Sequence, residues 1–223
     1  GTLVKAAEVL KERQFVVFPG FINTHTHCAL TVLRGQAEDV NTVQAVYGLM
    51  APFNRLMTEK ETYDVSRMAM AELLKFGSTT IVENSTHMDS VAQAAQDMGI
   101  RAFLGGGKIH DAHLEPIREN RYEYSDSIGR ESLRQAVEFV ETWDGRENGR
   151  IRCLLAPHAT DTVSPNLWHK VKSEADRLGM RITTHVSQNL SEVGQVQKIS
   201  GLRPVTYLKS LGVLDSRFIA AHG

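Results

Sequence analysis

Residues 19–27 of the chain read Pro19-Gly20-Phe21-Ile22-Asn23-Thr24-His25-Thr26-His27. Side chains two residues apart on a β-strand project from the same face, so a strand here would let His25 and His27 bind one ion. Imidazole nitrogen suits Zn²⁺, and also Fe²⁺, Co²⁺ or Ni²⁺. The segment therefore indicates a metal site at a strand end, although two packed or solvated histidines would give the same pattern.

Apolar residues before this pair predict a strand that is buried on both faces. Phe15-Val16-Val17-Phe18 continues through Phe21-Ile22-Asn23 toward His25, which leaves no solvated face. Five similar runs follow, at residues 79–82, 101–104, 151–155, 181–184 and 217–221. Helical patterns separate them, and this alternation is typical of βα units that form a parallel sheet.

Several of the intervening helices have recognisable ends. Thr58 and Glu61 form a capping box for a helix over residues 59–76, and Ser164-Pro165 begins another with a cap and a proline. Further helices are expected at residues 89–98, 133–143, 191–199 and 204–211. Gly105-Gly106-Gly107 predicts a loop after the third strand.

The histidines favour an α/β barrel over an open doubly wound sheet. Five of them lie at or just after C-terminal strand ends: His25, His27, His158, His185 and His222. A TIM-like (β/α) barrel brings the ends of distant strands to one mouth, whereas an open sheet holds its first and sixth strands apart. The other histidines are expected on the surface or in loops, with His110 able to face the pocket: His87, His110, His113 and His169.

Composition narrows the class of function. A chain of 223 residues with 42% hydrophobic residues and a formal net charge of −1 can form one globular enzyme domain. It has no positive field for nucleic acid or an anionic membrane, and no run approaches the roughly 20 apolar residues of a membrane helix. We therefore expect a cytoplasmic protein with a small-molecule partner, in which Cys28 and Cys153 stay reduced.

The segment Pro19–His27 resembles the strand-one signature of the amidohydrolase superfamily, PGxxNxHxH. The likeness continues at Leu33-Arg34-Gly35, Ala156-Pro157-His158, Thr184-His185 and Ala220-Ala221-His222, as in the deaminase and chlorohydrolase branch. This branch includes enzymes similar to cytosine deaminase and triazine hydrolase. The resemblance implies a metal-dependent hydrolase barrel.

By this resemblance, His25, His27 and His185 hold one divalent metal ion, zinc first and iron second. His222 lies beside the substrate as a catalytic group, and His158 binds substrate. The implied reaction is hydrolysis of a C–N or C–Cl bond of a nitrogen heterocycle by activated water, with deamination foremost. The alternatives are hydrolysis of an amide or cyclic amide, and a catalytically impaired relative that binds a metal and a ligand.

Two departures from the branch concern chemistry. Gln188 stands where a glutamate usually shuttles protons, and an amide cannot do so at neutral pH. Gln188 could still serve in catalysis by orienting substrate, while Glu192 is a weak candidate for the shuttle. Asn54 and Gly105-Gly106-Gly107 replace a ribose-binding glutamate and arginines, which argues against S-adenosylhomocysteine as substrate.

The third departure concerns completeness. The resemblance implies eight βα units and a final aspartate ligand on strand eight, whereas six units are recognised here. Residues 1–14 are then a possible remnant of the small β-sandwich, and residues 15–223 a barrel incomplete at its C-terminus. The open strand edge should be closed by a partner subunit, by a missing C-terminal segment or by aggregation, and among these a homo-oligomer is expected.

Overall fold

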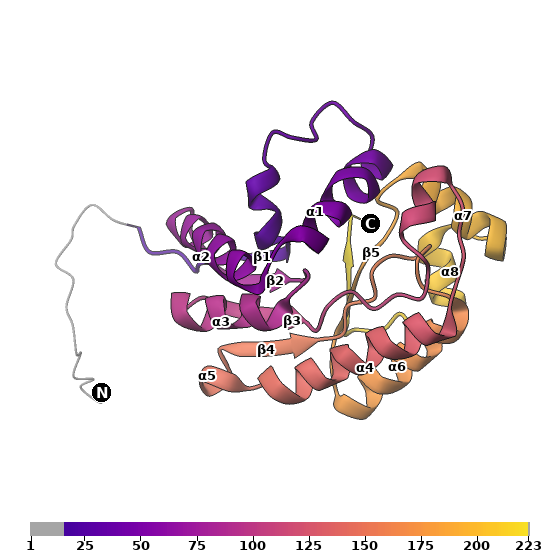
Figure 1. The fold of residues 1–223 in the computed structure, drawn as a ribbon. Helices are drawn as coiled ribbons and strands as arrows, with labels where there is room; N and C mark the ends of the chain where they lie inside the picture. Colours follow the sequence, from indigo (N-terminus) through magenta and orange to yellow (C-terminus); the bar gives the residue numbers. More distant parts are fainter. Residues whose placement is uncertain (1–15, 223) are drawn as a thin grey trace.

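The computed structural model describes residues 16–222 (Figure 1). The possible β-sandwich remnant at residues 1–14 lies outside them, as does Phe15. Four strands form a parallel sheet in the order β1-β2-β3-β4, and β5 and β6 form a parallel pair. The strands are β1 (Phe21–Thr26), β2 (Ser78–Glu83), β3 (Arg101–Gly105), β4 (Ile151–Leu154), β5 (Ile182–His185) and β6 (Phe218–Ala221).

The segment after β4 joins the two groups of strands. Leu155 forms a parallel bridge to Ile182, and Ala159 forms another to His185. The Leu155 N–H donates to the Arg181 carbonyl at 2.9 Å, which continues the parallel hydrogen bonding from β4 to β5. The six strands therefore follow one parallel arc, as expected for part of a TIM-type barrel.

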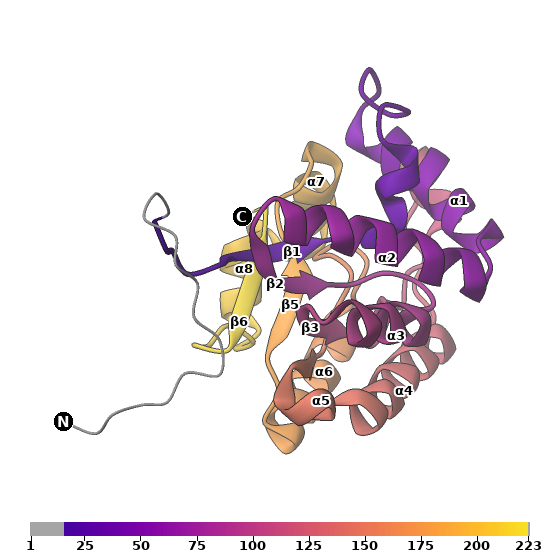
Figure 2. The same ribbon diagram turned by 90° about the vertical axis from the view of Figure 1, so that its left-hand side faces the viewer.

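Helices alternate with the strands and cover the arc (Figures 1 and 2). They are α1 (Ala51–Leu56), α2 (Glu59–Lys75), α3 (Met88–Met98), α4 (Asp126–Trp143), α5 (Arg146–Gly149), α6 (Pro165–Leu178), α7 (Leu190–Ser200) and α8 (Pro204–Ser210). Both halves of the Thr58 capping box are present, and Ser164 caps α6 by accepting from the Leu167 N–H. The predicted helices are confirmed, except that α4 begins at Asp126, well before residue 133, because its first turns are too polar to show apolar periodicity.

The predicted burial of the first strand is wrong. β1 begins only at Phe21, and Val16, Val17 and Phe18 before it are 75%, 93% and 75% exposed. Phe21 and Ile22 are also largely exposed. β1 is the end strand of its sheet, hydrogen-bonded to β2 alone among the described strands. An unbroken apolar run therefore did not distinguish a central strand from an edge strand here.

The core lies between the other strands and their helices. Fully buried side chains include Ile81 on β2, Leu104 on β3, Met70 on α2 and Trp168 on α6. Cys28 and Cys153 are buried free thiols, so the expectation that they form no disulfide is confirmed. Among residues 16–222, no helix combines the length and the apolar character that crossing a membrane requires.

Sequence patterns did not predict α1, α5 or three further short helices. These three are the 3-10 helix η1 (Cys28–Leu33), the π-helix η2 (Gln44–Met50) and the 3-10 helix η3 (Glu115–Glu119). η2 runs directly into α1, and π-helical turns occur disproportionately at functional sites. Tyr47 of η2 reaches the ring of His158 after β4, so this segment lies over the C-terminal ends of the strands.

Candidate metal centre and substrate site

Four histidines from β1, β5 and β6 converge at the C-terminal ends of these strands. The ring centroid of His25 lies 4.7 Å from that of His27, 4.8 Å from that of His185 and 5.0 Å from that of His222. His222 stacks on His185 with centroids 5.5 Å apart and planes 15° apart. The fold thus joins residues from both ends of the described chain at one point.

Hydrogen bonds to backbone carbonyls orient two of these rings. His27 Nδ1 lies 2.6 Å from the Asn84 carbonyl oxygen, and His185 Nδ1 contacts the His158 carbonyl oxygen. A carbonyl only accepts, so both rings carry their proton on Nδ1 and present Nε2 as a lone pair. The two Nε2 atoms face each other at 3.2 Å. Two lone pairs so close repel unless a cation lies between them.

This spacing fits a metal ion. Two nitrogens bound at about 2.0–2.1 Å to one tetrahedral zinc ion lie about 3.3 Å apart, close to the observed 3.2 Å. Ligand atoms of His25, His185 and His222 also all lie within 4.8 Å of one another. The residues present therefore fit a divalent metal, and His222 lies at the same point as the three histidines that the sequence singles out.

The rings of His25, His27 and His185 are held in the neutral form that metal ligation requires. Burial, reinforced by the neighbouring His222, lowers the pKa of His25 to about 4. Burial lowers the pKa of His185 to about 3, although the hydrogen bond to the His158 carbonyl acts in the opposite direction. Burial also lowers the pKa of His27 well below its usual value. These three rings are therefore uncharged at neutral pH, each with one proton and one lone pair on its nitrogens.

His158 forms the wall next to this cluster. It is buried, its centroid lies 5.4 Å from that of His185, and its Nδ1 lies 3.1 Å from Thr162 Oγ1. The centroid of His110 lies 6.5 Å from that of His158, so His110 is beside the site, whereas His87, His113 and His169 are exposed. The Tyr47 ring centroid lies 6.3 Å from that of His158, and its buried hydroxyl has no hydrogen-bond partner among the described residues. No sequence signal identified Tyr47.

Lys108 is a second residue that the sequence patterns missed. It follows the three glycines at the end of β3, and its positive charge adds to the effect of burial in lowering the pKa of His27, His158 and His185. Burial lowers the pKa of Lys108 itself, and the nearby Glu83 carboxyl opposes that shift. A lysine just beyond a barrel strand lies where active-site residues gather, which was the available signal.

Glu192 is occupied by structural hydrogen bonds. Its Oε1 accepts from the Ser187 N–H at 2.9 Å and from the Thr160 hydroxyl, and its Oε2 accepts from the Gln188 N–H at 2.8 Å. The side chain is fully buried at the start of α7. The carboxylate therefore fixes the loop that follows His185, and the suggestion that it shuttles protons loses its support.

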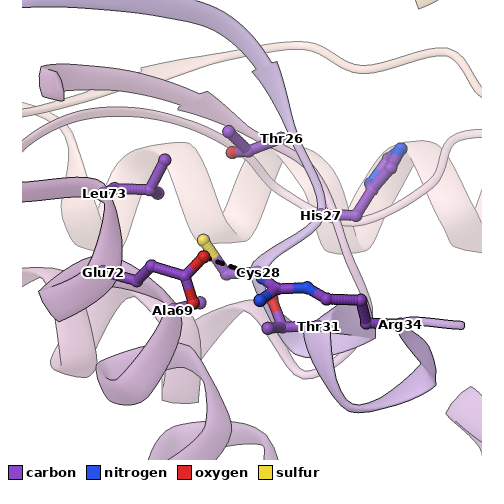
Figure 3. Close-up of a pocket in the computed structure, with 8 residues that line it drawn as sticks. All are labelled: Thr26, His27, Cys28, Thr31, Arg34, Ala69, Glu72 and Leu73. Carbon is purple, nitrogen blue, oxygen red and sulfur yellow. Dashed lines mark hydrogen bonds and ion pairs between the residues drawn. The ribbon is translucent and has the colours of Figure 1, made fainter. Parts of the chain in front are cut away.

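A cavity of about 190 Å³ lies between η1 and α2, beside the end of β1 (Figure 3). Thr26, His27 and Cys28 line one side of it. Arg34 and Glu72 form an ion pair at 2.9 Å on its lining, and both side chains are substantially exposed. Arg34, part of the resemblance noted in the sequence, thus joins η1 to α2 in this structure.

Comparison with known proteins agrees with this geometry. The chain is 36% identical over 207 residues to a 5-methylthioadenosine/S-adenosylhomocysteine deaminase of Carboxydothermus hydrogenoformans, covering 93% of this chain and 45% of that protein. A zinc-bound adenosine deaminase from Xanthomonas campestris superposes with a TM-score of 0.78 at 29% identity, covering 92% of this chain and 44% of that one.

An atrazine chlorohydrolase from Arthrobacter aurescens, complexed with zinc, shares the fold with a TM-score of 0.77 at 21% identity, covering 92% of this chain and 48% of that one. The chain spans about half the length of the curated relatives it matches. Residues 16–223 match the profile described as Amidohydrolase family. With its parallel βα arc and its histidines at the strand ends, the chain belongs to the amidohydrolase family.

Proposed function

We propose that this chain carries the metal and substrate site of a hydrolase that cleaves a C–N bond of a nitrogen heterocycle, with deamination as its reaction. The observation that carries the proposal is the 3.2 Å approach of the His27 and His185 Nε2 atoms, each left as a lone pair by a carbonyl on Nδ1. The named deaminase relatives support the reaction class.

His25, His27 and His185 are the proposed ligands of one divalent metal ion, zinc in preference to iron. We prefer His27 to His222 as the third ligand because a carbonyl fixes the tautomer of His27, whereas His222 is exposed. Nearly all metal-binding histidines donate their other ring N–H to a carbonyl or carboxylate in this way, which fixes the ring's orientation. When bound, such an ion acts as a Lewis acid and lowers the pKa of water toward neutrality.

The remaining residues bind substrate and move protons. His158 has its Nδ1 beside Thr162, which leaves Nε2 to bind a polar atom of the substrate. His222 is the proposed catalytic group, and a nitrogen of its imidazole ring accepts and donates the proton. Its ring packs against those of His25 and His185. Gln188 orients substrate through hydrogen bonds of its amide and does not transfer a proton.

The proposed substrate is a small heterocycle, with neither nucleic acid nor a membrane surface as partner. Gly105 and Gly106 bear on its identity, because a Cβ at either position would lie 2.6 Å from Ala156 Cβ or the Ala136 carbonyl oxygen. Packing thus excludes arginine at these two positions, which supports the argument against S-adenosylhomocysteine despite the names of several relatives. We also propose that the enzyme is cytoplasmic and homo-oligomeric.

Three other reactions or roles remain as alternatives: release of chloride from a heterocycle, hydrolysis of an amide or cyclic amide, and ligand binding without catalysis. Metal analysis of the purified protein, followed by assays of the zinc-loaded protein for ammonia and chloride release across a heterocycle panel, separates them. Ammonia release supports the proposal. Bound zinc without any turnover favours the binding role, and failure to bind any divalent metal refutes the proposed centre.

Gln188→Glu tests the proton pathway in a catalytically active preparation. A carboxylate restored at a shuttle position is expected to alter the pH–rate profile, because general acid–base groups contribute about 10²–10⁴-fold to rates. Gln188→Asn is the matched control, since it keeps the amide. Unchanged kinetics for the glutamate variant over a wide pH range contradict the assigned role of Gln188.

A further inference from the structure

The end of β2 holds the end of β1 through four side-chain hydrogen-bond contacts, one of which runs from the Thr26 hydroxyl to the Val82 carbonyl oxygen at 2.9 Å. Glu83 Oε2 accepts from the Thr26 hydroxyl at 2.7 Å and from the Cys28 N–H at 2.8 Å. His27 Nδ1 lies 2.6 Å from the carbonyl oxygen of the next residue, Asn84. Glu83, the last residue of β2, thus binds both chain neighbours of His27, and Asn84, the next residue, binds His27 itself.

The direction of the side chains along β1 explains this arrangement. His25 and His27 project from one face of the strand, so Thr26 projects from the other. Thr26 and Glu83 are register partners of the parallel pair β1 and β2. Glu83 therefore contacts the strand from the side opposite the histidines and fixes its backbone without entering the histidine cluster.

Stability alone does not explain an acid at this position. Glu83 is completely buried, and its Oε1 has no hydrogen-bond partner among the described residues. A buried acid is costly to desolvate, and well-packed apolar residues often replace buried charged groups without loss of stability. The hydrogen bonds that Glu83 makes all go to the two neighbours of His27, so its effect is local to the metal pair.

We propose that Glu83 is a positioning residue of the metal centre, which holds Thr26 and Cys28 so that His27 keeps its Nδ1 on the Asn84 carbonyl and its Nε2 toward His185. This inference rests on the proposed metal function. Residues that orient metal ligands from outside the coordination sphere typically contribute about 10–100-fold to metal affinity.

Zinc affinity of the apo protein, measured by competition with a chromophoric chelator, tests the proposal without any assay of activity. Glu83→Leu removes the acceptor and is expected to weaken zinc binding about 10–100-fold. Glu83→Gln keeps one carbonyl oxygen that both donors can reach, so its affinity should stay within about threefold of wild type. The matched control is Asp111→Asn, which alters a buried carboxyl that accepts from the Ser164 N–H at the start of α6.

Amide hydrogen exchange at Cys28 in the apo protein gives a second, metal-independent measurement. Loss of the Glu83 acceptor should accelerate exchange at Cys28 in Glu83→Leu and leave it slow in Glu83→Gln. If Glu83→Leu does not fold, Thr26→Val removes one of the two donors and should still weaken zinc binding several-fold.

The outcomes separate this inference from the metal proposal. A wild-type protein that binds no zinc refutes the metal centre itself, and the positioning role with it. A wild-type protein that binds zinc, together with a folded Glu83→Leu variant of equal affinity, refutes the positioning role alone. An equal loss of affinity in Asp111→Asn overturns it as well, because the effect would then follow from general destabilisation.

Discussion

Replacing Glu192 by glutamine is expected to destabilise the protein by about 1–3 kcal/mol. Two donors reach Oε1 and one reaches Oε2, so the amide oxygen of glutamine should take the place of Oε1. Its NH₂ group then faces the Gln188 N–H, and two donors meet where a hydrogen bond existed. One buried N–H left unpaired costs about 1–3 kcal/mol, partly offset because a buried charge is removed.

Urea unfolding followed by circular dichroism measures this loss, provided that the slope of unfolding free energy against urea is unchanged. Glu131→Gln is the control, since Glu131 is an exposed partner of Arg134 and its loss should leave the unfolding free energy nearly unchanged. In an active preparation, Glu192→Gln should keep the shape of the pH–rate profile. A variant as stable as wild type that also lost its general-acid limb would refute the anchoring role.

Three further predictions concern the buried Asp161, the metal ligand His185, and the apolar residues Val17 and Met70. Burial, with the negative charge of Glu192 adding to it, raises the pKa of Asp161 to about 7. The pKa of aspartate in the unfolded chain is about 4, so the unfolding free energy of the wild type should fall as the pH rises from about 4 to 7. Asp161→Asn should remove that fall, and parallel unfolding curves for both proteins at pH 4.5 and 7.5 would contradict it. His185→Ala should abolish tight zinc binding while Nε2 of His27 loses its partner at 3.2 Å; calorimetry showing wild-type affinity would exclude His185 as a ligand. Val17→Ser should change the unfolding free energy by less than about 0.5 kcal/mol because Val17 is 93% exposed. Met70→Ala in the core should lower it by about 2–5 kcal/mol, and thermal unfolding of both variants measures the difference.

Sequence reasoning missed the roles of some side chains that depend on the contacts they make in the folded chain. Gln188 lies in the loop before α7, and Glu192 lies in the first turn of that helix. The Glu192 carboxylate binds backbone N–H groups of the loop, including the N–H of Gln188 itself. The exposure of Val17 likewise depends on what flanks β1 in space. The contacts of Glu192 are close in sequence, but residue type does not state whether a carboxylate meets backbone N–H groups or a substrate, and hydrophobicity does not state what flanks a strand in space.

The sequence by itself determined the βα alternation, the caps of α2 and α6, and the placement of His25, His27, His158, His185 and His222 at strand ends. Those features depend on periodicity and on hydrogen bonds within a few residues, so short-range patterns predict them. Only the tertiary structure decided which imidazole nitrogens face the centre, because the carbonyl that binds His27 comes from a residue 57 positions away, and the one that binds His185 from a residue 27 positions away. The tautomer of these two rings, and so their capacity to bind a metal, is set by backbone that follows β2 and β4.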